Sequence, residues 1–226
     1  HSALRVAHLA AHSIHAGIQL YGSLDHHWSA QMGNNPLLSM SGKYFLETLN
    51  AIAKAEGDFD WHVAFHPYPE NLFNPRTWED ATATASFDSK KITFKNIEML
   101  PAFLRQPRFL HNGKARRVIL SEQGFHSTDG KNGERDQAAA YAYSYYRVKQ
   151  TEGIDAFILH RHVDHPGEGG LRLGLRSSRD GGVRPVYNVF RQADTAAWLE
   201  VFNFALPIIG VKSWSETLPI RQPQKE

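Results

Sequence analysis

The sequence predicts an α/β protein built around a parallel β-sheet, because strand-like and helix-like segments alternate along most of its 226 residues. Four short segments have strand character, at residues 18–24, 61–65, 118–121 and 154–159. Val118 to Leu120 are apolar without polar alternation, which suits a strand covered on both faces. Strand–helix–strand units form right-handed crossovers, so the four strands are expected to lie parallel in one sheet.

Helices are expected before, between and after these strands, where apolar residues recur at a spacing of three or four. The predicted helices are residues 3–14, 41–55, 97–104, 135–151 and 185–204. Ser41 has the side chain of an N-cap, and Pro185 suits the first turn of the last helix. We expect residues 71–91 to form a long loop. We expect residues 211–226 to form a polar tail that lies on the surface or is disordered.

The composition is that of an ordinary globular protein, with 42% hydrophobic and 21% charged residues. A formal net charge of +2 gives no argument for nucleic acid or a membrane as a partner. The absence of cysteine excludes disulfides, thiolate metal sites and cysteine nucleophiles. No apolar run approaches the roughly 20 residues of a membrane span. The localisation stays unknown, with a secreted or periplasmic protein as one option, because no targeting segment is visible.

Chemically capable polar residues follow each predicted strand. They are Asp25, His26, His27 and Trp28 after the first strand, His66 and Tyr68 after the second, Glu122 after the third, and His160, His162 and Asp164 after the fourth. In parallel sheets and barrels, active sites lie at the carboxyl ends of the strands. Glu122 is therefore a catalytic candidate. Its structural alternative is an ion pair with Arg116, Arg117 or Arg161 at the rim of the sheet.

Three of these segments resemble motifs of the large clan of retaining glycoside hydrolases with (β/α)8 barrels. Ile119-Leu120-Ser121-Glu122-Gln123-Gly124-Phe125 is similar to the clan's seventh-strand motif, in which the glutamate is the nucleophile. His66-Pro67-Tyr68 is similar to its sixth-strand His-x-Tyr motif, and residues 155–160 occupy the place of its eighth strand. The motifs also resemble those of bacterial glycosidase-like domains of unknown function. The resemblance covers roughly residues 3–205.

This resemblance implies an α/β fold of the (β/α)8 TIM-barrel type, of which the chain covers about the last four βα units, strands 5–8. Residues 1–210 would form a partial barrel of catalytic type, and residues 211–226 a C-terminal tail. Residues 3–14 already have helical character at the very start of the sequence. We therefore expect a fragment, which upstream residues or a second chain would complete. The exposed strand edges of a half-barrel favour such an association.

The resemblance also implies a carbohydrate substrate, no cofactor or metal, and a retaining mechanism with Glu122 as the nucleophile. Tyr68 would orient Glu122, and the other strand-end residues would bind sugar hydroxyls, with Trp28 or Tyr68 offering an apolar face. Retaining hydrolysis needs a second carboxyl group about 5–5.5 Å away as the proton donor. In the clan this group lies on strand four, which would precede residue 1. Asp25 and Glu70 are the nearby substitutes, and His-Arg-His stands where the clan usually places an aromatic residue.

Two other functions stay open. A metal-dependent barrel hydrolase would use His160 and His162, which point the same way along an extended segment, together with His66, Asp25 and Glu122. In barrel metallohydrolases, however, the His-x-His pair normally lies on the first strand and not on the last. A non-catalytic carbohydrate-binding pseudoenzyme would result from loss of the proton donor.

Overall fold

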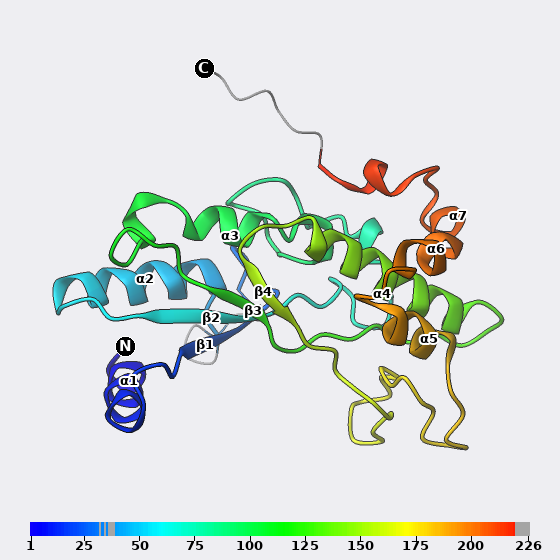
Figure 1. Cartoon of the computed structure of the whole chain (residues 1–226), viewed down its shortest axis with the longest axis horizontal. Helices are drawn as coiled ribbons and strands as arrows, with labels where there is room; N and C mark the ends of the chain where they lie inside the picture. The colour runs from blue at the N-terminus through cyan, green and yellow to red at the C-terminus, as the bar shows by residue number, and fades with distance from the viewer. Residues whose placement is uncertain (32, 34, 36–38, 220–226) are drawn as a thin grey trace.

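The computed structural model describes residues 1–31, 33, 35 and 39–219. Within them, β1 (Leu20–Asp25), β2 (Trp61–His66), β3 (Val118–Leu120) and β4 (Ile154–Phe157) form a parallel sheet in the order β1-β2-β3-β4 (Figure 1). The prediction of an α/β protein with these parallel strands is confirmed, and each strand differs from its expected bounds by at most two residues. All four carboxyl ends therefore lie at one edge of the sheet.

Helices precede and follow the strands in the expected order. They are α1 (Ser2–Ile14) before β1, α2 (Gly42–Ala55) before β2, α3 (Met99–Leu104) before β3 and α4 (Gly133–Lys149) before β4. The connections around α3 contain the 3-10 turns η1 (Thr77–Glu79), η2 (Phe94–Asn96) and η3 (Pro107–Phe109). Ser41 caps α2, since its side chain accepts a hydrogen bond from the Tyr44 N–H at 3.4 Å. In Figure 1, α2 and α3 lie above the strands, and α1 lies below them against β1.

The prediction of a single last helix over residues 185–204 is wrong. The segment is divided into α5 (Pro185–Gln192), α6 (Trp198–Phe202), the 3-10 turn η4 (Asn203–Ala205) and α7 (Leu206–Ile209). The helix breaks near Asp194, whose backbone φ of 65° is left-handed. The Asp194 carboxylate accepts hydrogen bonds from the Tyr145 hydroxyl and from Lys149 Nζ, both on α4. Helical periodicity did not reveal the break, because the contact that stabilises it is tertiary.

Residues 211–219 pack against α4 and do not form the expected surface tail. Trp214, in the 3-10 turn η5 (Trp214–Thr217), is 8% exposed and stacks on Tyr146 with 5.0 Å between ring centroids. Arg147 Nη1 donates a hydrogen bond to the Thr217 carbonyl at 2.7 Å. Burial of Trp214 removes a large apolar area from water, and this favours packing although the surrounding residues are polar. Residues 220–226 of the predicted tail lie outside the described residues.

The core lies between the sheet and the helices that cover it. Trp61, Phe65 and Leu120 of the strands are fully buried. Tyr141 of α4 is 3% exposed and stacks on Phe157 of β4 with 5.4 Å between ring centroids. Side chains of this size stabilise a fold by about 1.5–3 kcal/mol each when they leave water. This packing holds the sheet rigid, so the side chains at its carboxyl edge have defined positions.

In contrast, α1 and the two outer strands leave apolar side chains uncovered. No residue of α1 is buried, and Val6, Leu9 and Ile14 are 67%, 62% and 82% exposed. Within the described residues, β1 and β4 each pair with one strand only, and Ile158 just after β4 is 50% exposed. Uncovered edges of this kind have room for further strands. No helix of the described residues has both the length and the apolar character needed to cross a bilayer.

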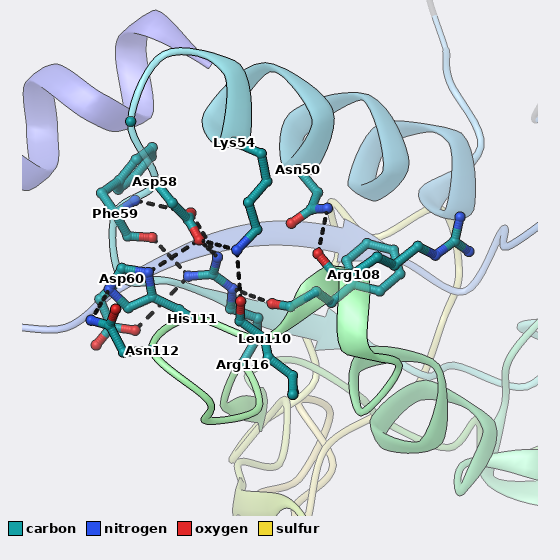
Figure 2. Close-up of polar contacts among 12 residues, drawn as sticks. Asn50, Lys54, Asp58, Phe59, Asp60, Arg108, Leu110, His111, Asn112 and Arg116 are labelled. Atoms are coloured by element: carbon teal, nitrogen blue, oxygen red, sulfur yellow. Dashed lines mark hydrogen bonds and ion pairs between the residues drawn. The ribbon is translucent and has the colours of Figure 1, made fainter.

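A buried ion pair joins the amino ends of β2 and β3, as Figure 2 shows. Arg116 is 3% exposed, and its Nη2 donates to both carboxylate oxygens of Asp58 at 2.7 Å. Its Nη1 donates to the Phe59 carbonyl at 2.7 Å, and Lys54 Nζ donates to Asp58 at 2.6 Å. Burial by itself raises the pKa of Asp58, but hydrogen bonds from Lys54, Arg116 and His111 outweigh it and lower the pKa to about 2.

We expect Asp58→Asn to destabilise the chain more at neutral pH than in acid. The pKa of about 2 lies below the ordinary 3.8, so the stabilisation is complete above about pH 4 and is lost as the pH falls to about 2. The shift corresponds to about 2 kcal/mol. Urea unfolding at pH 7 and near pH 2 measures the difference. The control is Asp88→Asn, which removes only an exposed pair with Lys43. An equal loss from Asp58→Asn at both pH values would contradict this account.

Candidate active site

Glu122 and Tyr68 meet at the carboxyl edge of the sheet. Glu122 lies two residues beyond β3, and Tyr68 lies two residues beyond β2. The Tyr68 hydroxyl donates a hydrogen bond to Glu122 Oε1 at 3.1 Å. Both residues are half-buried. The structure thus contains the contact that the sequence predicts between them.

The environment of Tyr68 keeps its hydroxyl protonated. Burial and the negative charge of Glu122 raise the pKa of Tyr68 well above its ordinary value of 10. The charge of Glu168 raises it further, and the charge of Arg161 opposes the effect. At physiological pH the hydroxyl therefore acts as a donor to Glu122 Oε1. Glu122 Oε2 accepts no hydrogen bond from the described residues, so this oxygen is available to a ligand.

His66 connects three neighbouring strands next to this pair. It is the last residue of β2, and its Nε2 lies 3.1 Å from Ser121 Oγ and 3.3 Å from Ser23 Oγ. Ser121 immediately precedes Glu122, so the imidazole helps to fix the position of the segment that carries the carboxylate. Sequence reasoning selected His66 for sugar binding but missed the serines, because a single serine at a strand end carries little signal.

The segment after Glu122 lies against the segment after β4. Gln123 is fully buried, and its backbone carbonyl accepts a hydrogen bond from the His160 N–H at 2.8 Å. Its side-chain amide donates to the Ile158 carbonyl. A Cβ on Gly124 would lie 2.2 Å from the His160 carbonyl oxygen, so the close approach of the two backbones requires glycine here. This contact explains the glycine two residues after the candidate nucleophile.

Glu168 is a site residue that sequence reasoning missed. His160 Nε2 and Arg161 Nη1 lie 2.8 Å and 3.1 Å from the same Glu168 oxygen, Oε1. The peptide bond between His160 and Arg161 is cis. Because the charges of Arg161 and Glu168 both act on the pKa of Tyr68, this cluster lies within electrostatic reach of the Tyr68–Glu122 pair. Glu168 comes from an irregular loop, where no periodic pattern could have indicated its position.

The structural alternative for Glu122, an ion pair with an arginine, is absent from the described residues. The three candidate arginines bind other carboxylates: Arg116 pairs with Asp58, Arg117 with Asp155 and Arg161 with Glu168. Glu122 therefore has no cationic partner in this part of the chain. A carboxylate at a strand end that the protein itself does not neutralise is suited to act on a bound molecule.

At the end of β1, the predicted residues are divided between the rim and the interior. Asp25 is exposed beside His66 in register, and its Oδ1 accepts a hydrogen bond from the His27 N–H at 2.7 Å. His26 points inward, is 6% exposed and has its Nε2 3.1 Å from Lys91 Nζ. Burial and the charge of Lys91 lower the pKa of His26 to about 4, so its imidazole is neutral. His26 is a buried structural residue, contrary to the predicted sugar contact.

Trp28 and Asp164 also differ from their predicted roles. Trp28 is fully buried and its indole N–H donates to the Phe87 carbonyl at 2.9 Å, so its ring cannot stack on a sugar. The side chain of Asp164 is 7% exposed and bonds to the Arg184 guanidinium at 2.9 Å and 2.5 Å. His162 is exposed on the loop after β4. The sequence indicates that these residues follow a strand, but it does not show whether a neighbouring loop covers their side chains.

The strand-end histidines do not gather into a metal-binding set. In the part of the chain that the structure describes, no group of three or more His, Cys, Asp or Glu residues is placed to hold a metal ion. His66 contacts serines, His160 contacts Glu168 and His26 contacts Lys91. These separate partnerships count against the metal-dependent hydrolase.

A polar cleft lies between the segments that follow β3 and β4. It has a volume of about 950 Å³ and lies between residues 127–135 and residues 164–185. Glu122 does not line it, but the first of these segments begins five residues after Glu122. The cleft is therefore formed by segments that leave the same edge of the sheet as Glu122, and it is not the place where the Glu122–Tyr68 pair lies.

We expect Gly124→Ala to destabilise the chain and displace Glu122, because the added methyl group would lie 2.2 Å from the His160 carbonyl oxygen. Overpacking of this kind costs about 1–3 kcal/mol. The measurement is urea unfolding. Gly22→Ala is the matched control, since its Cβ would meet only ordinary contacts at 3.8 Å or more. If both variants unfold at the same urea concentration, the close approach does not constrain the site.

The structure resembles that of a family 39 glycoside hydrolase from the gut symbiont Bacteroides cellulosilyticus WH2, with a TM-score of 0.52 and 17% sequence identity. The match covers 69% of this chain and 30% of that chain. At this identity the likeness concerns the fold alone. No curated protein matches the chain in sequence. The model of a family of unknown function, DUF5722, matches residues 1–217, and the chain therefore belongs to that family.

Proposed function

We propose that this chain carries the nucleophile of a retaining glycoside hydrolase and that Glu122 is this nucleophile. The observation that carries the proposal is the hydrogen bond from the Tyr68 hydroxyl to Glu122 Oε1, 3.1 Å long, at the carboxyl edge of a parallel sheet. The fold likeness to a family 39 glycoside hydrolase supports the same class of enzyme. The substrate would be a carbohydrate.

The geometry around Glu122 suits covalent catalysis. In the first step Glu122 Oε2 attacks the anomeric carbon, the bond to the leaving oxygen breaks, and a carboxylic acid gives its proton to that oxygen. In the second step water, deprotonated by the same acid/base group, displaces Glu122 and restores the carboxylate. Tyr68 donates a hydrogen bond to Oε1 throughout, because its raised pKa keeps the hydroxyl protonated. It thereby holds the attacking oxygen in one orientation.

The proton donor of this mechanism would come from another part of a (β/α)8 barrel. Asp25 and Glu70 are poor substitutes, because both carboxylates already bind the backbone. Glu70 accepts hydrogen bonds from the N–H groups of Ala81 and Thr82 at 3.0 Å and 2.7 Å, and Asp25 accepts one from His27. In the proposed barrel, this chain supplies strands 5–8, and strands 1–4 pair with the uncovered edges of β1 and β4. Upstream residues or a second chain would supply those strands.

Sugar hydroxyls would be bound by the polar residues that remain accessible along the same edge. His66 and His160 are half-buried next to the Glu122 segment, and Asp25 and His27 lie on the rim at the end of β1. These side chains offer both donors and acceptors, which sugar hydroxyls require. The competing function is a non-catalytic carbohydrate-binding protein, which would use the same side chains without a proton donor.

We expect Glu122→Gln to abolish turnover of aryl glycosides, by at least about a thousandfold, because an amide cannot form the covalent intermediate. Tyr68→Phe keeps the ring and removes the hydroxyl donor, so kcat should fall about tenfold to a hundredfold. Tyr44→Phe, on a tyrosine that is 59% exposed, is the control and should not change kcat. The measurement uses a panel of aryl glycosides with this chain and with an upstream-extended chain.

The same panel separates the competing functions. Turnover by the extended chain that Glu122→Gln removes would support the retaining hydrolase. Binding of oligosaccharides without turnover in either chain would replace it with a carbohydrate-binding protein. Hydrolysis of an ester or amide that requires added zinc and survives Glu122→Gln would overturn the nucleophile assignment.

A further inference from the structure

We propose that the cleft beside the Glu122 edge binds an anionic substituent, a carboxylate or a sulfate ester, on the carbohydrate that this chain recognises. The inference rests on the proposed function for its substrate and extends it by naming the class of sugar. Four features carry it: the position of the cleft, the charges that line it, a buried arginine that joins its two walls and an exposed aromatic ring close to one wall.

The cleft lies on the same side of the molecule as the candidate nucleophile. One wall, residues 127–135, runs from the segment after Glu122 into the first turn of α4. The other wall, residues 164–185, runs from the loop after β4 to the first turn of α5 and is coloured yellow to orange in Figure 1. Five residues of extended chain separate Glu122 from the cleft, which is a distance of at most ~18 Å.

The acidic side chains of the cleft are already occupied. All four carboxylates that line it have partners within the protein. Asp129 pairs with Arg172, Asp164 and Glu134 pair with Arg184, and Asp180 accepts a hydrogen bond from the Gly182 N–H. These partnerships reduce the repulsion that an incoming anion would otherwise meet.

Three basic side chains of the cleft have no such partner. Lys131, Arg135 and Arg179 line it and are exposed, and they form no ion pair and no side-chain hydrogen bond with the described residues. The cleft therefore presents uncommitted positive charge from both walls, since Lys131 and Arg135 belong to one and Arg179 to the other. Ammonium and guanidinium groups are the side chains that bind carboxylates and sulfates most strongly, and arginine does so with two parallel hydrogen bonds.

A buried arginine belongs to the wall of the cleft. Arg184 is 5% exposed, and its Nη atoms bind Asp164. Its Nε has no hydrogen-bond partner among the described residues, and the nearest carboxylate oxygen, Glu134 Oε1, lies 3.5 Å away. The Arg184–Glu134 ion pair therefore joins the two walls of the cleft.

An exposed aromatic ring points to a sugar and not to a free anion as the ligand. Phe73 is 51% exposed and contacts His126 edge to face, with 5.2 Å between ring centroids. His126 lies four residues after Glu122 and immediately before Ser127, the first residue of the cleft wall. Phe73 therefore lies near the chain segment that joins Glu122 to the wall of the cleft. An exposed ring of this kind offers the apolar face on which a sugar ring packs.

The test measures binding of three tetrasaccharides by isothermal titration calorimetry. The probes are a tetragalacturonate, a sulfated galactose tetrasaccharide and the neutral galactose tetrasaccharide. We expect at least one anionic probe to bind at least tenfold more tightly than the neutral one. In the triple variant Lys131→Gln, Arg135→Gln and Arg179→Gln, this preference should be lost. The two anionic probes decide between a carboxylate and a sulfate as the substituent.

The matched control replaces three exposed basic residues that lie outside the cleft and have no ion pair with the described residues, Lys90→Gln, Lys114→Gln and Arg191→Gln. It removes the same net charge and should bind all probes as the original chain does. Equal weakening in the control would show a non-specific charge effect and overturn the proposal, as would equal affinity for anionic and neutral probes. Charge-selective binding without any turnover would keep this inference while the proposed hydrolase fails.

Discussion

The register between β2 and β3 determines where the candidate site can form. Phe65 pairs with Leu120, so the residues that follow each strand leave the sheet at the same level. Tyr68 and Glu122 come two residues beyond their strands, and this places the hydroxyl and the carboxylate within a hydrogen bond of each other. A slip of one residue would shift the two strand ends relative to each other by ~3.3 Å and move the hydroxyl away from the carboxylate.

The two ends of the β2–β3 pair are fixed by different kinds of interaction. At the amino ends, Arg116 binds Asp58 and the Phe59 carbonyl, and its guanidinium lies 4.2 Å from the ring centroid of Trp61. This arginine precedes β3 by two residues, so the interaction ties the start of β3 to the start of β2. It is buried, and loss of either partner would leave an uncompensated charge. At the carboxyl ends, weaker polar contacts leave side chains accessible to a ligand.

Some charged side chains at the carboxyl edge are paired with other residues of the protein, and others are not. Asp164 and Glu168 are bound by arginines, and these pairs fix the loop after β4. Glu122 has a tyrosine instead of a cation, so its negative charge is oriented without being neutralised. The cleft follows the opposite pattern, with occupied carboxylates and uncommitted basic groups. An extended substrate with a reactive bond and a charged substituent would require an unpaired carboxylate at one place and free basic groups at another.

The sequence by itself determined the fold class, the order of the elements and the Glu122–Tyr68 pair. The first two features follow from local pattern, since hydrophobic periodicity marks the four strands and the helices before residue 185 within about two residues, and parallel strands place their carboxyl ends at one edge. The pair was implied by the resemblance of two short motifs to those of retaining glycoside hydrolases, and each motif stands next to a strand end.

Only the tertiary structure decided which strand-end side chains stay accessible and which are buried. Trp28 and His26 follow β1 as directly as His27 does, yet loop 71–91 covers the first two, as the contacts with Phe87 and Lys91 show. Asp194 breaks the last predicted helix because α4 supplies partners for its carboxylate. Whether a side chain is buried, and which group it bonds to, depends on segments that are distant in the sequence. Residue type and hydrophobic periodicity do not contain that information. The physical reason is that the free energy of a polar group depends on what surrounds it, which the fold alone determines.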